Sequence, residues 1–307
     1  MEGYFKNKSI FHLIIKWKYH LVIIIFISLL LSYFFSSSLF ITPKYKSFAV
    51  VYPVNMINYS SESTTEQMLQ ILKSYDIRTN IYKNLELAKH YKIDTTKKHY
   101  LSELNSKFES NVTFNKTEFE SVEINVLDKD PVFACKLVDS IISYYSQKVA
   151  SLHKSKFSEV LIINNYEIKK KKNEIDSLEK LVYEYRTKYG ILDYRIQTIE
   201  VSKQIGSNNK EVKNIVANLQ EKGGDYLATD SLLWKAWRDY WWLKNGIESA
   251  QREVHKKISY VQEVTKPFPA DKKSYPVRWL IVLLSIIGTL FASLITISVI
   301  ESKKNIS

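Results

Sequence analysis

Two apolar stretches decide the fold of this chain: LVIIIFISLLLSYFFSSSLFI at Leu21–Ile41 and WLIVLLSIIGTLFASLITISVI at Trp279–Ile300. Neither contains a charged residue, and each is close to the ~20 residues that a helix needs to cross a hydrocarbon core of about 30 Å. A long core helix of a soluble protein would carry a polar stripe at helical spacing, which neither stretch has. The sequence therefore predicts transmembrane helices at 21–41 and 279–300, with a polar segment between them.

A cleavable signal peptide is the alternative interpretation of the first stretch. Its apolar part is longer than a signal peptide's hydrophobic region of about 7–15 residues, and Ser36–Ser38 is a weak cleavage site. Aromatic residues of the kind found at membrane interfaces flank both stretches, at Trp17, Tyr19 and Trp279. We therefore favour a membrane anchor at each end.

Charge beside the two stretches predicts the orientation. Positive residues favour the cytoplasmic side, and they occur in the tails 1–20 and 301–307, as Lys6, Lys8, Lys16, Lys18, Lys303 and Lys304. Lys272, Lys273 and Arg278 lie on the opposite side and weaken the asymmetry. We expect a multi-pass membrane protein with both tails in the cytoplasm and the middle segment outside, which in a Gram-negative cell means the periplasm.

The middle segment, 42–277, is basic. Seven of the 44 Lys and Arg residues and two of the 32 Asp and Glu residues lie outside it, so 37 and 30 remain and the net charge is +7. Such a surface beside a membrane would attract anionic lipid headgroups or a phosphate-linked substrate. The simpler interpretation is a solvated, Lys-rich surface. We expect the membrane as a partner, and no nucleic acid.

The first part of the middle segment, 42–150, reads as a compact α+β base. Its patterns predict a strand, a helical region, two strands and a helix, at 45–54, 61–92, 108–112, 121–127 and from 131 onward. Asp130 before Pro131 suits an N-cap and the first helical position.

The next part, 151–264, reads as an antiparallel helical hairpin of coiled-coil type. Apolar residues from Phe157 to Tyr189 recur at helical spacing and predict a helix of about 50 residues, which Gly190 would kink. Gly206-Ser-Asn-Asn and Gly223-Gly224 read as turns around a short helix at 210–221. A second long helix follows, with an apolar stripe from Trp237 to Val261.

Three further residues, Trp237, Trp241 and Gly288, each have more than one interpretation. Trp237 and Trp241, in a cluster with Trp234 and Trp242, would pack against the first long helix or form a subunit contact or a sugar-stacking surface. Of the two functional interpretations, subunit packing is the better. Gly288 would allow a second helix or a polymerase to approach the second span, although it has no GxxxG partner.

The connector at 265–278 contains Pro267, Pro269 and Pro276. Because proline cannot continue a helix, these residues would stop the second long helix and stiffen the entry into the membrane. A plain linker is the alternative.

No catalytic pattern is visible in the sequence. The six histidines lack metal-ligand spacing, the seven glycines form no phosphate-binding loop, and Cys135 lies on an apolar helical face, where a core role is more usual than a nucleophilic one. We expect a non-enzymatic protein without a metal or cofactor.

Four stretches resemble the polysaccharide co-polymerases, the Wzz-type chain-length determinant proteins, and in particular their Bacteroidota-type members. They are YKSFAVVYPV (45–54), SYDIRTNIYKNLELAKHYKID (74–94), LDKDPVFACKLVDSIISYYSQKV (127–149) and KPFPADKKSYPVRW (266–279). Asp130, Pro131 and Ala134 match the family's D-P-x-x-A helix, and the three connector prolines match its proline-rich segment. Seven residues follow Ile300, so we expect the type without a tyrosine-kinase domain.

The resemblance implies a non-enzymatic inner-membrane homo-oligomer that governs chain length in the synthesis of O-antigen lipopolysaccharide, capsule or exopolysaccharide. It implies a membrane polysaccharide polymerase as a partner, and a lipid-linked glycan as a possible one. The alternative is a structural scaffold or adaptor of a cell-envelope export or secretion complex. Such adaptors usually have one N-terminal anchor and lipoyl-like β-rich halves around their hairpin, whereas this sequence has neither that pairing nor the second β half.

Overall fold

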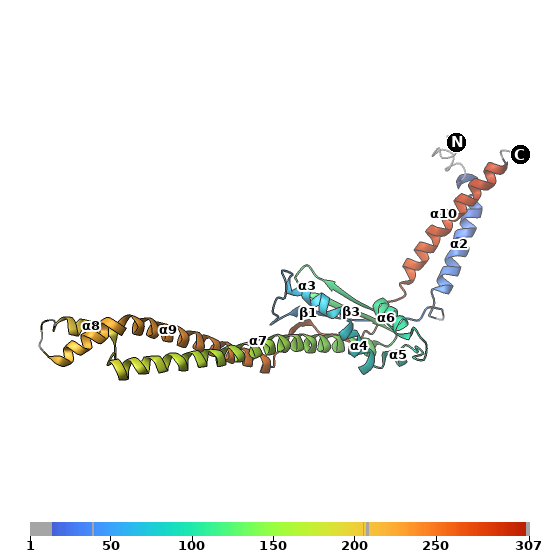
Figure 1. Cartoon of the computed structure of the whole chain (residues 1–307). Helices are drawn as coiled ribbons and strands as arrows, with labels where there is room; N and C mark the ends of the chain where they lie inside the picture. Colours follow the sequence, from blue (N-terminus) through green and yellow to red (C-terminus); the bar gives the residue numbers. More distant parts are fainter. Residues whose placement is uncertain (1–13, 39, 205, 207–208, 305–307) are drawn as a thin grey trace. The chain divides into compact units, whose positions relative to one another are not determined.

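The computed structural model describes residues 14–38, 40–204, 206 and 209–304 (Figure 1). The chain forms two compact units, one made of the residues up to Lys148 together with those from Ser259 onward, and the other made of Val149–Ile258. Lys6 and Lys8, on which the predicted orientation partly rests, lie outside the described residues, as do Ser207 and Asn208 of the first predicted turn.

Two apolar helices lie side by side in the first unit: α2 (Lys18–Phe35) and α10 (Arg278–Lys304) (Figure 1). Both are long and apolar enough to cross a membrane, with mean hydropathies of 1.9 and 2.6. Only 6% and 11% of these spans is buried, whereas a core helix of a soluble protein is mostly buried. Helix α2 ends at Phe35, before the apolar stretch itself ends at Ile41.

The rest of the first unit, which we call the base, contains a four-stranded antiparallel sheet. The strands are β1 (Tyr45–Pro53), β2 (Val112–Lys116), β3 (Val122–Asp128) and β4 (Val261–Thr265), in the spatial order β2-β3-β1-β4. Strand β1 pairs with β3 from Tyr45↔Asp128 to Val51↔Val122, and its other edge pairs with β4. The segment between β3 and β4, which contains α7, α8 and α9, is therefore an insertion between two strands of one sheet.

Alternation along the strands builds one side of the core. Successive strand side chains point to opposite faces, and every second residue of β1 from Ser47 to Val51 is buried, as are Val122, Ile124 and Val126 of β3. The helices α3 (Thr64–Leu72), α4 (Tyr75–Asn84), α5 (Leu87–His90) and α6 (Tyr100–Asn111) and the start of α7 add the largest buried side chains: Met68, Leu72, Ile77, Ile81, Leu87, Phe108, Leu137, Ile141 and Tyr145. The predicted α+β base is confirmed.

The second unit, which we call the arm, is an antiparallel pair of long helices. Helix α7 (Pro131–Tyr189) has 59 residues and α9 (Lys210–His255) has 46. Contacts between them join Lys171 to Asp239 (3.6 Å), the ring of Tyr185 to that of Tyr226 (centroids 6.0 Å apart), and Asn218 to the carbonyl of Tyr189 (2.9 Å). Partner numbers fall along α9 as they rise along α7, so the predicted hairpin is confirmed (Figure 1).

A small apolar cluster closes the end of the arm. Helix α7 ends at Gly190, whose φ of +70° is in the left-handed region that glycine tolerates best. Helix α8 (Tyr194–Ser202) follows, and the Asp193 side chain caps it by accepting hydrogen bonds from two backbone N–H groups. The buried members of the cluster are Val182, Ile191, Leu219 and Tyr226. Helix α8 has no counterpart among the predicted elements, because its nine residues carry only a weak apolar pattern.

Several local predictions were wrong. The residues 108–112 end a helix, α6, and strand β2 starts at Val112, while 61–92 forms three helices with breaks between them. Gly223-Gly224 lies inside α9 and forms no turn, so the predicted short helix at 210–221 is the beginning of one long helix. Val261 belongs to β4, and α9 ends at His255, well before the prolines predicted to stop it.

Candidate functional site

The start of α7 is fixed by Asp130. Its Oδ1 accepts hydrogen bonds from the backbone N–H groups of Val132 (2.9 Å) and Phe133 (3.3 Å), which are among the unpaired donors of a helix start. Pro131 is the first helical residue, and Ala134 is fully buried, with its N–H donating to the Asp130 carbonyl. The predicted N-cap is confirmed, and a role of these three residues as a family motif stays a prediction.

Contacts of the Asp128 side chain support this cap. The buried Asp128 accepts a hydrogen bond from the Asp130 N–H (3.0 Å), and its Oδ1 lies 2.9 Å from His90 Nε2. The His90 ring stacks on Phe133, with centroids 3.6 Å apart and an interplanar angle of 8°. Sequence reasoning missed this cluster, because α5, β3 and α7 come together only in the folded base.

The connector runs beside the chain that enters β1. Ser47 Oγ donates to the Phe268 carbonyl (3.0 Å), the rings of Phe48 and Phe268 meet edge to face, and the backbone of Lys44 pairs with that of Tyr275. Pro267 is half-buried, Pro269 is exposed and Pro276 is buried after a cis peptide bond. The connector is therefore attached to the base along its length.

Polar side chains join the two apolar helices. Ser28 Oγ of α2 lies 2.7 Å from Thr289 Oγ1 of α10, and Lys16 forms an ion pair with Glu301 at the other end of the pair. Small and hydroxylated residues let membrane helices approach closely and hydrogen-bond. The hydroxyl pair therefore sets where α2 contacts α10.

Gly288 precedes Thr289 but does not share its contact. It is exposed, and a Cβ added to it would meet no atom within 4 Å. The close approach of α2 and α10 thus does not depend on this glycine. Its predicted role in contacting another subunit or a polymerase stays a prediction.

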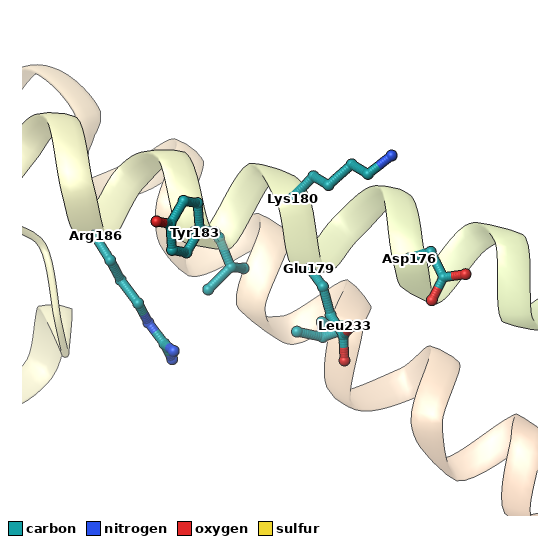
Figure 2. A pocket seen from close by; sticks show the side chains of 7 residues that line it. Asp176, Glu179, Lys180, Tyr183, Arg186 and Leu233 are labelled. Carbon is teal, nitrogen blue, oxygen red and sulfur yellow. The ribbon is translucent and has the colours of Figure 1, made fainter.

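An open groove of about 660 Å³ lies along the arm and is lined by Asp176, Glu179, Lys180, Val182, Tyr183, Arg186 and Leu233 (Figure 2). Asp176 pairs with Lys172 at 2.9 Å, whereas Glu179 and Arg186 make no ion pair within the described part of the chain. Tyr183 is 69% exposed. The groove offers charges of both signs beside an aromatic ring, which suits binding a polar ligand or a neighbouring polypeptide.

The tryptophans of α9 divide into packed and exposed members. Trp237 is half-buried, and Lys172 Nζ of α7 lies 5.4 Å from its ring centroid. Trp241 stacks on Trp237 but is 51% exposed, and Trp234 and Trp242 are more exposed still. Packing against the first long helix therefore holds for Trp237, while the other three form an exposed aromatic surface. Such surfaces are common at protein interfaces.

Cys135 is half-buried on α7, in the base. Burial and the nearby Asp139 raise the pKa of its thiol. A nucleophilic cysteine needs a lowered pKa, so this environment favours a packing role. No set of three metal-ligating side chains comes together among the described residues.

No family model matches the sequence, and no curated protein matches it. Among solved structures, the chain is similar to a full-length bacterial polysaccharide co-polymerase, with 9% identity, a TM-score of 0.37 and coverage of 96% of this chain and 97% of that one. It is also similar to a fragment of WzzB, a polysaccharide co-polymerase from Salmonella Typhimurium (14% identity, TM-score 0.32, coverage 76% and 100%).

A third similar structure is the wild-type lipopolysaccharide O-antigen chain-length regulator WzzBSF of Shigella flexneri (7% identity, TM-score 0.34, coverage 75% and 100%). Because the TM-scores lie below 0.5, we base the functional proposal on the elements and residues of this chain.

Proposed function

We propose that this chain is a polysaccharide co-polymerase that regulates chain length in the synthesis of O-antigen lipopolysaccharide, capsule or exopolysaccharide. The observation that carries the proposal is the pairing of α2 with α10, which places both ends of the base on one apolar helix pair. The base and arm would lie in the periplasm of a bacterium, with the helix pair in its inner membrane.

The four stretches of family resemblance support the proposal through the elements that they form. The first is strand β1, the second contains α4 and α5, and the third joins the end of β3 to the capped start of α7. The fourth is the connector that runs beside β1 into α10. Apart from Val149, all four stretches belong to the first unit, so the resemblance concerns the base and the entry to the membrane more than the arm.

The surface of the arm supports self-association. Ile162, Ile163 and Tyr166 on α7 are each more than 60% exposed, and Trp234 and Trp242 on α9 are about three-quarters exposed. Large apolar side chains exposed in such number on two helices are candidates for an interaction surface. We propose that copies of the chain associate through the arms, and that the lipid-facing sides of α2 and α10 contact the polymerase.

Such an assembly would act by positioning the growing glycan and not by making or breaking bonds. The groove beside Tyr183 and Arg186 has the aromatic and hydrogen-bonding groups that a saccharide contacts. The lipid-linked glycan is therefore proposed as a ligand of the assembly.

Deletion of the gene in its own host tests the function. Surface polysaccharide separated on a gel should lose its preferred length, and the wild-type gene on a plasmid should restore it. Complementation by Lys169→Gln, an exposed change on the arm, is the matched control and should also restore the length. An unchanged ladder after deletion would contradict the proposal.

Cross-linking in the native membrane separates this function from the scaffold alternative. A ladder of multiples of the 36.0 kDa chain supports a homo-oligomer. Recovery of the chain only in complexes with an outer-membrane channel would instead support a scaffold of an export machine.

A further inference from the structure

Two lysines of the base, Lys44 and Lys107, lie near the same residue, Asn111. Lys44 Nζ donates a hydrogen bond to the Oδ1 of the buried Asn111 at 2.5 Å. Lys107 lies four residues before Asn111 on α6, so the two side chains share one helix face. Neither ammonium group forms an ion pair in the described part of the chain, and the exposed Lys107 places its charge 6.0 Å from the Tyr91 ring centroid.

Positive charge in this site is only partly compensated. Burial lowers the pKa of Lys44, and the neighbouring charge of Lys107 lowers it further, while Asp128 acts in the opposite direction. The Asp128 side chain is buried and already accepts a hydrogen bond from the Asp130 N–H and contacts His90. An anion arriving from solvent or membrane would therefore meet two ammonium groups that form no ion pair among the described residues, with the buried Asp128 compensating part of the charge of Lys44.

The chain connectivity places this site beside the membrane. The N–H of Lys44 donates to the carbonyl of Tyr275 at 3.0 Å, and Tyr275 is three residues before the start of α10 at Arg278. Three residues of extended chain span at most about 10 Å. The polar headgroup region adds about 5–8 Å on each side of the hydrocarbon core. Lys44 is thus restricted to the depth of the headgroups or just above them.

More positive charge occurs in the same connector. Lys272 and Lys273 precede Tyr275, and neither forms an ion pair within the described residues. Arg278 opens α10, and its buried Nε has no hydrogen-bond partner in the described part of the chain. The surface near the entry to the second span therefore has the charge that anionic headgroups attract.

We propose that Lys44 and Lys107 bind the phosphate of an anionic phospholipid in the membrane that α2 and α10 cross. Lys44 is held in place by Asn111 and by the backbone pair with Tyr275, so one cation of the site is preorganised. Lys107 is free to adjust to the headgroup. The site would fix the depth of the base at the membrane surface, which is a role separate from any effect on glycan length.

The full-length chain in mild detergent, titrated with phosphatidylglycerol or phosphatidylcholine and observed by native mass spectrometry, tests the site. The wild-type chain should retain phosphatidylglycerol at a lower concentration than phosphatidylcholine. The double variant Lys44→Gln/Lys107→Gln should lose about fivefold in apparent affinity for each lysine, as expected for basic residues near an anionic surface. Lys169→Gln/Lys170→Gln removes the same charge from exposed positions on the arm and should bind like the wild type.

A single variant and a competition experiment test the lipid site further. Lys107→Gln alone leaves the Lys44–Asn111 hydrogen bond intact, so it reports on binding even where the double variant folds poorly. Glycerol 3-phosphate in solution should compete only weakly with phosphatidylglycerol for the site, because it lacks the acyl chains that partition into the detergent micelle. Unchanged lipid retention in Lys107→Gln, an equal loss in the arm control, or competition by glycerol 3-phosphate as strong as by the lipid would each overturn the proposal.

Discussion

The ring of Tyr194 lies against Gly223 in the interior of α9, in the space that a Cβ at this glycine would need. The adjacent Gly224 has no atom within 4 Å of its would-be Cβ. Two neighbouring glycines of one helix therefore have different functions, since the first makes room for α8 and the second only weakens the helix.

Substitution of these glycines by alanine should have opposite effects. Gly223→Ala displaces Tyr194 and should destabilise the arm by about 1–3 kcal/mol, the usual cost of overpacking. Gly224→Ala should stabilise it by about 0.5–1 kcal/mol, because glycine is a poor residue for a helix interior. Thermal unfolding followed by circular dichroism measures both, and a shift of the same sign in the two variants would contradict this assignment.

Loss of the cap at α7 should destabilise the base. Asp130→Ala removes the acceptor of the Val132 and Phe133 N–H groups and should cost about 1 kcal/mol. Asp130→Ser keeps a capping oxygen and is the control, with most of the stability retained. Urea unfolding measures the difference, and equal midpoints for the two variants would mean that the cap contributes nothing.

The hydroxyl pair between the apolar helices should have a small coupling energy. A double-mutant cycle with Ser28→Ala and Thr289→Ala should give about 0.6 kcal/mol, the average for hydrogen bonds between membrane helices. Thr296→Ala is the control, because the Thr296 hydroxyl donates to Ala292 of its own helix. Unfolding in mixed micelles measures the cycle, and a coupling equal to that of Ser28 with Thr296 would refute the contact.

Acidification should destabilise the arm through His153. Burial lowers the pKa of this histidine, with Lys156 and Lys256 acting in the same direction and Glu253 opposing them. The unfolded state, with a pKa near ~6.5, then takes up a proton more readily than the folded state, so stability falls as the pH drops below that value.

Urea unfolding at neutral and mildly acidic pH measures this effect. His153→Gln should reduce the loss of stability on acidification, while His255→Gln, at the exposed end of α9, should leave it as in the wild type. An identical pH dependence in His153→Gln and the wild type would count against the assignment.

The exposed and packed tryptophans should be separable by mutation. Trp241→Ala should weaken cross-linking between copies with little change in thermal stability, because half of its surface is exposed. Trp237→Ala should lower stability, because it loses the contacts with Lys172 and Tyr240. Cross-linking that is unaffected by Trp241→Ala would exclude this residue from the subunit contact.

Long-period patterns predicted the architecture, whereas features that depend on tertiary contact were missed. The apolar stretches and the repeat from Phe157 to Tyr189 extend over many turns, so they identify spans and a hairpin without knowledge of neighbours. Gly223-Gly224 reads as a turn because nothing local reveals the ring of Tyr194. Strand β4 was assigned to a helix because its five residues gain their structure by pairing with β1, about 210 residues earlier in the chain.

In the candidate sites, too, features set by nearby residues were predictable and those set by tertiary contacts were not. The cap at Asp130 uses neighbours within three residues and was predictable, whereas the exposure of Trp241, expected to pack beside Trp237, was not. The Lys44–Asn111 contact joins residues 67 positions apart, and no periodicity signals it. The net charge of the middle segment left anionic headgroups, a phosphate-linked substrate and a plain solvated surface all open, and it could not single out Lys44 and Lys107.

The insertion of the arm between β3 and β4 separates its length from the folding of the sheet. The strand pairs from Tyr45↔Asp128 to Pro53↔Val261 are made by β1, β3 and β4 alone, and no residue between Asp128 and Val261 takes part in them. Removing seven residues from α7 and the facing seven from α9 would shorten the hairpin by about 10 Å and keep the same faces in contact. The length of the arm can thus change by whole heptads, in evolution or by design, while the base and its membrane anchors remain as they are.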